Sequence, residues 1–232
     1  MGLIIADPVA YYRFEGDSID SGPNGYNGTD SGSPTYGAGK FGQGITYVSA
    51  SSQRTDTDAS HVAELNAYTV NLWFKTTNTG ESTLWSNGNS GSDNAYSRVS
   101  IGAPTAGKIY WEFRDDGGST LGSITSASTY NDGVWHPLRL ERTAANAWEM
   151  FVDGVSVGTS SANLSTMTIN VAAIGVLKRT SYVIYANASI DEVNIFSRTV
   201  TAGERVTLNT LENFIAAGGN PIFFQGGGLA LG

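Results

Sequence analysis

Acidic and amide side chains gather in an opening segment made almost entirely of turn-forming residues. Asp17, Asp20, Asn24 and Asn27 lie within residues 15–44, with glycines between them. Calcium in proteins is bound by carboxylate, amide, backbone carbonyl and water oxygens. A long segment of this composition predicts either an ion-binding loop or a series of Asx turns, in which the same side chains bond only to their own backbone.

Aromatic and amide residues in the middle of the chain suggest a second kind of chemistry. A sugar presents apolar C–H faces and a rim of hydroxyls, so its site combines an aromatic ring with polar neighbours. Trp85, Asn87 and Tyr96, or Trp111 with Phe113, could form such an aromatic platform. The alternative is that these rings belong to the core, which is the commoner place for aromatic residues in a β-sandwich.

The two histidines do not form a catalytic constellation. His136 follows Trp135 at the start of an expected strand, where a packing role is usual. His61 lies in a polar region with Asp56 and Asp58, and no nucleophile is paired with it. Acid–base or nucleophilic catalysis needs a pair of groups that act together. The sequence therefore predicts a binding or structural protein rather than an enzyme.

Composition predicts one all-β domain. The chain has 232 residues, no cysteine, 29 glycines and only 15% charged residues, a composition that suits strands and turns rather than long helices. The net charge of −8 argues against nucleic acid or an anionic membrane as partner, because both require a basic surface. The first residues lack the basic and apolar regions of a signal peptide, and no segment has the length of a transmembrane helix.

Alternating and turn-bounded patterns predict the strands. Residues 68–75 alternate apolar and polar side chains, and residues 148–157 read as a hairpin around Asp153-Gly154. A helix is predicted from about residue 202 to residue 213, with Thr201 and Glu204 as a capping box. The other expected strands cover residues 9–14, 82–86, 97–101, 108–114, 120–126, 166–176 and 188–196.

The last residues differ from the rest in character. We place the domain at residues 1–213 and a tail at residues 214–232, which is apolar, glycine-rich and almost uncharged. Such a segment is seldom left exposed on a soluble monomer. It either packs on its own domain or forms an assembly arm that docks on a neighbouring subunit, through residues Pro221, Ile222, Phe223, Phe224 and Leu229.

The order of these landmarks resembles the concanavalin A-like lectin/glucanase superfamily, in its bacterial and phage laminin-G-like branch. The resemblance runs from about residue 8 to residue 212 and rests on residues 9–17, 20–29, 39–43, 68–75, 132–136, 151–154 and 190–196. It implies a two-sheet antiparallel jelly-roll sandwich with one short C-terminal helix. The chain departs from the family pattern at Tyr26, where histidine is common, and at Pro137, which favours an edge or bulged strand.

The resemblance also bears on the site. In similar modules the opening loop lies beside the strand that carries the aspartate of the Ile-Asp-Glu-Val motif, here Asp191. It therefore implies a structural calcium ion on Asp20 and Asp191 first, with Asp17 and Asn24 behind them. The paired acids of the superfamily's glycosidases are missing, and Asp191 and Glu192 are adjacent, so strand alternation predicts opposite faces for them.

Two non-enzymatic functions remain open. The first is a surface structural or adhesion protein, a phage virion component such as a head decoration or tail fibre, which docks through its tail on other subunits as an oligomer or assembly component. The second is a secreted or cell-surface carbohydrate-binding module. The expected partners are protein subunits, glycans or both, and the expected location is a virion surface or the extracellular space.

Overall fold

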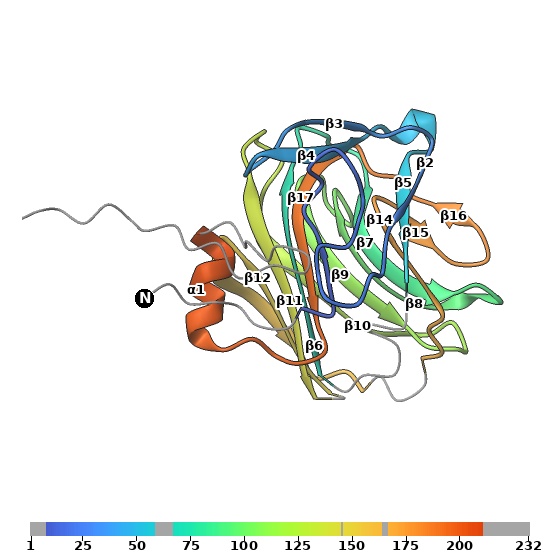
Figure 1. Cartoon of the computed structure of the whole chain (residues 1–232). Coiled ribbons are helices and arrows are strands. Elements are labelled where there is room, and N and C mark those ends of the chain that lie inside the picture. Colours follow the sequence, from blue (N-terminus) through green and yellow to red (C-terminus); the bar gives the residue numbers. More distant parts are fainter. Residues whose placement is uncertain (1–7, 59–66, 145, 164–166, 211–232) are drawn as a thin grey trace, which may run out of the picture.

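The described strands form two antiparallel sheets packed face to face. The computed structural model describes residues 8–58, 67–144, 146–163 and 167–210. Sheet A has the strand order β13-β12-β11-β6-β17-β4-β3, with β1 also paired to β17, and sheet B has the order β10-β9-β8-β7-β14-β5-β2. The sandwich is visible in Figure 1. The predicted all-β, two-sheet architecture with one short C-terminal helix is confirmed.

Sheet A contains the strands β1 (Ala10–Tyr12), β3 (Thr35–Ala38), β4 (Gln43–Tyr47), β6 (Tyr68–Lys75), β11 (His136–Ala144), β12 (Ala147–Val152), β13 (Val155–Ser160) and β17 (Ala188–Phe196). Sheet B contains β2 (Thr29–Ser31), β5 (Arg54–Thr57), β7 (Ser82–Asn89), β8 (Ser92–Ile101), β9 (Lys108–Arg114), β10 (Thr120–Thr129) and β14 (Val171–Ile174). A two-stranded hairpin of β15 (Leu177–Lys178) and β16 (Tyr182–Val183), a 3-10 turn at Ser49–Ser51 and the helix α1 (Ala202–Thr210) complete the described elements.

Strand alternation builds the core between the sheets. On β6, Val70, Leu72 and Phe74 belong to the main buried cluster, so the residues between them face the outer side of sheet A. Trp111, Phe113 and Trp148 pack edge-to-face or tilted within the same cluster, with Trp111 and Trp148 centroids 5.4 Å apart. The core is therefore apolar and aromatic, and it needs no covalent cross-links.

The opening segment contains more regular structure than its composition predicts. Strands β2 and β3, and the first residues of β4, lie within the stretch of turn formers that the sequence presents as one long loop. Asp20 organises the residues before them: its Oδ1 accepts hydrogen bonds from the Tyr11 and Gly22 amides, and its Oδ2 accepts one from the Tyr26 amide. The strands form because neighbouring strands of each sheet supply the backbone partners, which no local pattern reveals.

Pro137 does not mark an edge strand. Strand β11 lies inside sheet A, between β6 and β12, so the prediction of an edge position is wrong. Pairing with β12 begins only at Leu138, and the Pro137 carbonyl accepts a hydrogen bond from the Asp153 amide at 3.0 Å. The proline is accommodated because it lies at the end of that ladder, where a missing N–H costs no strand pairing.

The predicted hairpin and capping box are both present. Asp153 and Gly154 connect β12 to β13 with φ values of 54° and 77°, the left-handed pair that a two-residue hairpin turn requires. At the start of α1 the Thr201 amide donates to Glu204 Oε2 at 2.7 Å, and the Glu204 amide donates to Thr201 Oγ1 at 3.3 Å. These local signals suffice because each depends on residues close in the sequence.

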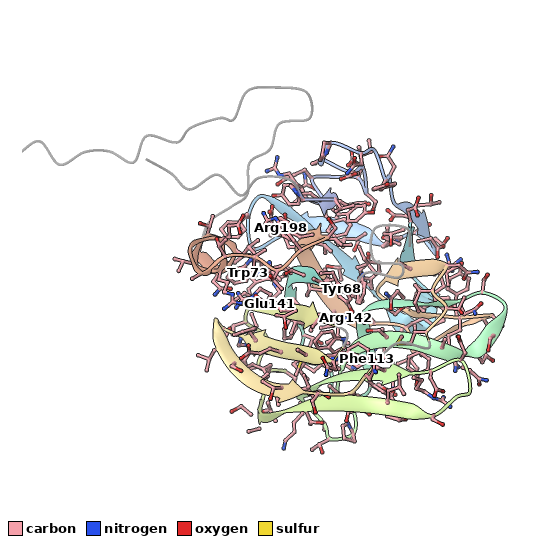
Figure 2. All side chains as sticks on the ribbon, turned by 90° about the horizontal axis from the view of Figure 1, so that it is seen from below. Tyr68, Trp73, Phe113, Glu141, Arg142 and Arg198 are labelled. Atoms are coloured by element: carbon pink, nitrogen blue, oxygen red, sulfur yellow. The ribbon has the colours of Figure 1, made fainter. Side chains whose placement is uncertain are left out.

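Helix α1 packs on the outer side of sheet A (Figure 1). Phe196, Val200 and Leu208 form a small apolar cluster there, and Arg205 pairs with the fully buried Glu141. Figure 2 shows Glu141 and Trp73 on this side of the sandwich. Within the described residues, no helix has the length and apolar character to cross a membrane. The tail residues Pro221, Ile222, Phe223, Phe224 and Leu229 lie outside the described residues, so the tail stays a prediction.

We expect Glu204→Gln to lower the free energy of unfolding at neutral pH by about 1 kcal/mol, because Arg198 contacts both carboxylate oxygens, at 2.9 and 2.6 Å. Arg198 lowers the Glu204 pKa to about 2, below its value of about 4.3 in an unfolded chain. The pair therefore stabilises the fold fully above that unfolded value, and its contribution is lost as pH falls toward 2. Urea unfolding of both proteins across this range measures the difference.

The control is the same substitution in an Arg198→Gln background, where the pH-dependent part of the difference should become smaller and only the share due to Thr201 should remain. A difference in unfolding free energy between Glu204→Gln and the parent that stays constant with pH would contradict the stabilising role of the Arg198–Glu204 pair.

Candidate functional site

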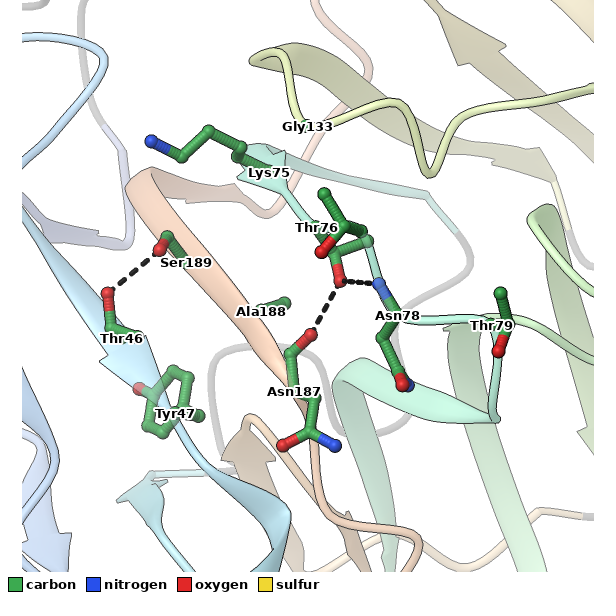
Figure 3. Close-up of a pocket in the computed structure, with 11 residues that line it drawn as sticks. Thr46, Tyr47, Lys75, Thr76, Asn78, Thr79, Gly133, Asn187, Ala188 and Ser189 are labelled. Carbon is green, nitrogen blue, oxygen red and sulfur yellow. Dashed lines mark hydrogen bonds between the residues drawn. The ribbon is translucent and has the colours of Figure 1, made fainter.

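A polar pocket opens where three strands of sheet A end. It has a volume of about 540 Å³ and lies between the ends of β4 and β6, the start of β17, the segment after β6 and Gly133 (Figure 3). A volume of this size is typical of sites that take small ligands. Its lining is dominated by hydroxyl and amide groups: Thr46, Tyr47, Lys75, Thr76, Thr77, Asn78, Thr79, Gly133, Asn187, Ala188 and Ser189.

Hydrogen bonds hold the polar walls of this pocket in place. Thr76 Oγ1 donates to the Asn187 carbonyl at 2.6 Å and accepts from the Asn78 amide at 2.9 Å, as Figure 3 shows. Asn187 Oδ1 accepts from the Ser49 amide at 2.8 Å, while its Nδ2 has no hydrogen-bond partner among the described residues. Thr46 and Ser189 share a 2.8 Å hydrogen bond across β4 and β17. The lining is thus preorganised and still offers donors to a ligand.

Trp135 forms a wall beside this pocket. The side chain is only half-buried, and the Lys75 ammonium lies 5.0 Å from its ring centroid. The same ring lines a second pocket of about 460 Å³, together with Lys40, Trp73, Pro137, Asp153, Val206 and Asn209. Lys40 lies 4.5 Å from the centroid of the buried Trp73 ring. The half-buried Trp135 ring therefore lines the second pocket and contacts Lys75 of the first.

His136 positions the segment that carries Trp135. Its Nδ1 lies 3.0 Å from both carboxylate oxygens of Asp153, and its Nε2 lies 3.0 Å from Asp132 Oδ1. The ring also packs against Phe74 and Tyr130, with centroids 5.7 and 5.2 Å away. His136 ties the β12–β13 turn to the turn before β11, as the predicted packing role requires, and it fixes the backbone on either side of Trp135.

The residues of the predicted aromatic platform are buried, so they do not form a sugar-binding surface. Trp85 and Trp111 are fully buried members of the core, so neither ring can stack on a sugar. Asn87 is buried, and its Oδ1 accepts from the Ser97 amide at 3.2 Å. Tyr96 is buried on the outer face of sheet B, where its hydroxyl donates to Glu112 at 3.0 Å and the Arg114 and Arg179 guanidinium groups each lie 5.5 Å from its ring.

The sequence missed Trp135, Lys75 and Asn187 as site residues. Trp135 attracted notice only as the neighbour of His136, yet its position after an Asp-Gly turn and before a strand is one that puts a ring at the rim of a sandwich. Nothing in the sequence links Asn187 to Thr76, since their contact joins segments more than a hundred residues apart.

The residues predicted to bind calcium form two separate groups. Asp17 accepts from the Ile19 amide at 3.1 Å, and Asn24 Nδ2 donates to the Val9 carbonyl at 2.9 Å, so these two serve turns near Asp20. Asp191 lies on β17 and accepts from the Lys40 and Phe41 amides at 2.7 and 3.0 Å. Within the described residues no group of three or more acidic or histidine side chains is placed to hold a metal ion. The four residues do not fit a calcium site as arranged, and calcium binding stays a prediction.

Asp191 and Glu192 lie on the same side of sheet A, contrary to strict alternation. Glu192 has a φ of 51°, and the pairing of β17 with β6 shifts register between Asp191 and Asn194. Ile190 and Val193 both belong to the core, so this bulge puts the two acids between them on the outer face. Asp191 bonds to the segment at Lys40, whereas Glu192 accepts from the Tyr11 hydroxyl.

The two-sheet antiparallel sandwich is the architecture of lectin-like jelly-roll domains. The chain belongs to the concanavalin A-like lectin/glucanases superfamily, whose family model matches residues 46–204. That match begins after the opening segment and ends inside α1. Among curated proteins, none matches the sequence.

Solved structures share this fold at low sequence identity. Domain 4 of the extracellular arabinanase AbnA from Geobacillus stearothermophilus, in complex with arabinotriose, has a TM-score of 0.68 and 19% identity, and the likeness covers 88% of this chain and 98% of that domain. The binding domain of botulinum neurotoxin serotype G has a TM-score of 0.65 and 16% identity, over 88% of this chain. The binding domain of Paraclostridial Mosquitocidal Protein 1 has a TM-score of 0.66 and 15% identity, over 88% of this chain. The likeness spans about half of each toxin binding domain, 50% and 51%.

We expect the stability of the domain to fall as pH rises from about 4 to about 7. Burial raises the Asp191 pKa to about 7, against the lowering effect of its three backbone N–H donors. Because the unfolded value is about 3.9, unfolding releases a proton between these limits, which costs about 1.4 kcal/mol of stability per pH unit. Denaturant unfolding across this pH range measures the change in unfolding free energy for the parent and for Asp191→Asn, which cannot ionise. The difference between the two proteins gives the contribution of Asp191.

The same measurement tests the calcium prediction. A calcium ion on Asp191 would keep the carboxylate ionised in the folded state and remove the slope, so the curves in calcium and in chelator should differ. If the free energy of unfolding changes with pH equally in calcium and in chelator, calcium ligation by Asp191 is contradicted. If this free energy falls no more steeply with pH in the parent than in Asp191→Asn, the raised pKa is contradicted.

Proposed function

We propose that this protein is a carbohydrate-binding module that acts by binding alone, outside the cell. The observation that carries the proposal is the half-buried Trp135 ring, which lines the second pocket and lies against Lys75 of the polar first pocket. An aromatic face can stack on the C–H surface of a sugar, while hydroxyl and amide groups on either side bond to its hydroxyls. Both parts of that requirement are met here within one surface.

The polar groups of the first pocket supply the expected bonding pattern. Asn187 Nδ2 and Lys75 Nζ have no hydrogen-bond partner among the described residues, and Thr77 and Thr79 are exposed at the rim. The scaffold beneath them is fixed by the Thr76–Asn187 and Thr46–Ser189 hydrogen bonds. Preorganised donors of this kind bind without a large ordering cost.

The structural likenesses support the proposal by analogy. Among proteins of the same fold, domain 4 of the arabinanase holds arabinotriose, and the two toxin structures are binding domains. Fold alone does not carry function from one protein to another. The ligand assignment for this chain therefore rests on its own pocket residues.

We expect Trp135→Ala to weaken glycan binding by about thirtyfold, the cost of removing an aromatic anchor of about 2 kcal/mol. A glycan array identifies the best ligand of the parent, and titration calorimetry compares the variants on it. Trp135→Phe, which keeps a stacking face, should retain most of the affinity. Tyr110→Ala is the matched control because this half-buried ring lies on β9 of sheet B. Equal loss in Tyr110→Ala, or none in Trp135→Ala, would contradict the assignment.

A second candidate function is that of a phage virion structural or adhesion protein. It is favoured by the apolar, glycine-rich sequence of residues 214–232, which suits docking on a neighbouring subunit. The two functions are compatible, since a virion surface protein can also bind glycans.

If the tail is an assembly arm, the full chain should have a native mass of many subunits, and removal of residues 216–232 should leave a folded monomer. Light scattering gives the mass, and circular dichroism checks the fold of the shortened chain. A monomer in both cases would exclude an assembly role for the tail, and lower thermal stability after truncation would indicate that it packs on its own domain.

A further inference from the structure

Two lysine ammonium groups lie along the proposed site without a carboxylate partner. Lys40 Nζ lies 4.5 Å from the Trp73 ring centroid, and Lys75 Nζ lies 5.0 Å from the Trp135 ring centroid. Within the described part of the chain, neither lysine forms an ion pair or a side-chain hydrogen bond. Other basic residues do find acids, as Lys178 does with Asp56 at 2.7 Å.

Strand register places these two lysines on one continuous surface. Trp73 and Lys75 are two residues apart on β6 and therefore face the same side. Pro137 is opposite Trp73, and His136 is opposite Phe74, so the next residue, Trp135, comes beside Lys75. The two pockets thus follow one another along the sheet: Lys75 of the first pocket lies over Trp135, and Lys40 of the second lies over Trp73.

The first pocket carries a local charge opposite in sign to that of the whole chain. Lys75 is the only lysine, arginine, aspartate or glutamate among the described residues that line it. Asp153 lines the second pocket, but both of its oxygens face His136 Nδ1, and the nearby Asp132 is bonded to His136 Nε2. On a chain with a net charge of −8, the Lys75 ammonium group, in a pocket lining without a carboxylate, attracts an anionic ligand that the acidic surface elsewhere repels.

We propose that the ligand is an acidic glycan, in which one sugar stacks on Trp135 and a sugar carboxylate is bound by Lys75, with Lys40 positioned for a second acidic group along the groove. The proposal rests on the proposed carbohydrate function and specifies its ligand class. An ammonium group binds a carboxylate as a compact point charge, and the indole beneath holds the lysine stem over the groove. The Asn187 amide then serves the hydroxyls of the same sugar.

The test measures binding of the full chain to pairs of oligosaccharides. Oligomers of galacturonic acid, oligomers of glucuronic acid and sialylated lactose are each compared with the carboxyl-reduced form, which has the same shape and no charge. The variants are Lys75→Met and Lys40→Met, which keep an apolar side chain over the ring. Lys108→Met removes the same charge from β9 of sheet B and is the matched control.

We expect at least one acidic oligosaccharide to bind about tenfold more tightly than its reduced form, which corresponds to one charged hydrogen bond. Lys75→Met should remove that preference, so that this variant binds the acidic and the reduced forms alike, whereas Lys108→Met should leave the preference unchanged. The preference should also shrink as salt rises from about 0.05 M to about 0.5 M.

The outcomes separate this proposal from the one it rests on. Equal binding of acidic and reduced forms, lost together in Trp135→Ala, would overturn the acidic ligand and keep the carbohydrate function. A preference that survives in both lysine variants would also overturn it. No binding of any charged or neutral probe in these pairs would count against both proposals.

Discussion

The buried carboxylate of Asp191 is the constraint on which much of sheet A depends. Strand β17 pairs with β6, β4 and β1, and its bulge at Glu192 turns two adjacent acids to the outer face. Asp191 then binds the Lys40 and Phe41 amides, while Glu192 binds Tyr11. A Cβ at Gly39 would lie 2.6 Å from Asp191 Oδ2, so the close approach of this segment requires glycine. Three backbone N–H donors offset part of the desolvation of this carboxylate, whose pKa is still raised by its burial.

The same strand connects this constraint to the candidate site. Asn187 directly precedes β17 and Ser189 lies within it, while Lys40, held through its amide by Asp191, lines the second pocket. Fixing β17 therefore fixes parts of both pockets. The other wall depends on His136, whose contacts with Asp132 and Asp153 hold Trp135 between two turns. A site built on strand ends and tied turns is more precise than one on a free loop.

Membership of the lectin/glucanases superfamily gives the fold, whereas a function has to be argued from the residues of the site. Trp85 and Trp111 are buried in the core, whereas Trp135 lies at the rim near amide, hydroxyl and lysine side chains. This division is physically reasonable because a core tryptophan contributes through buried area, while a rim tryptophan keeps one face available.

The sequence by itself determined the two-sheet all-β class, the strand set around residues 68–75, the hairpin at Asp153-Gly154 and the capping box of α1. Each is encoded by alternation or by residues within a few positions of one another, so local physics suffices. Only the tertiary structure decided that Trp85 and Trp111 are core while Trp135 is at the rim, that β11 is interior despite Pro137, and that a bulge joins Asp191 and Glu192 on one face. Those outcomes depend on which strands become neighbours, and burial follows from contacts between segments that are distant in the sequence.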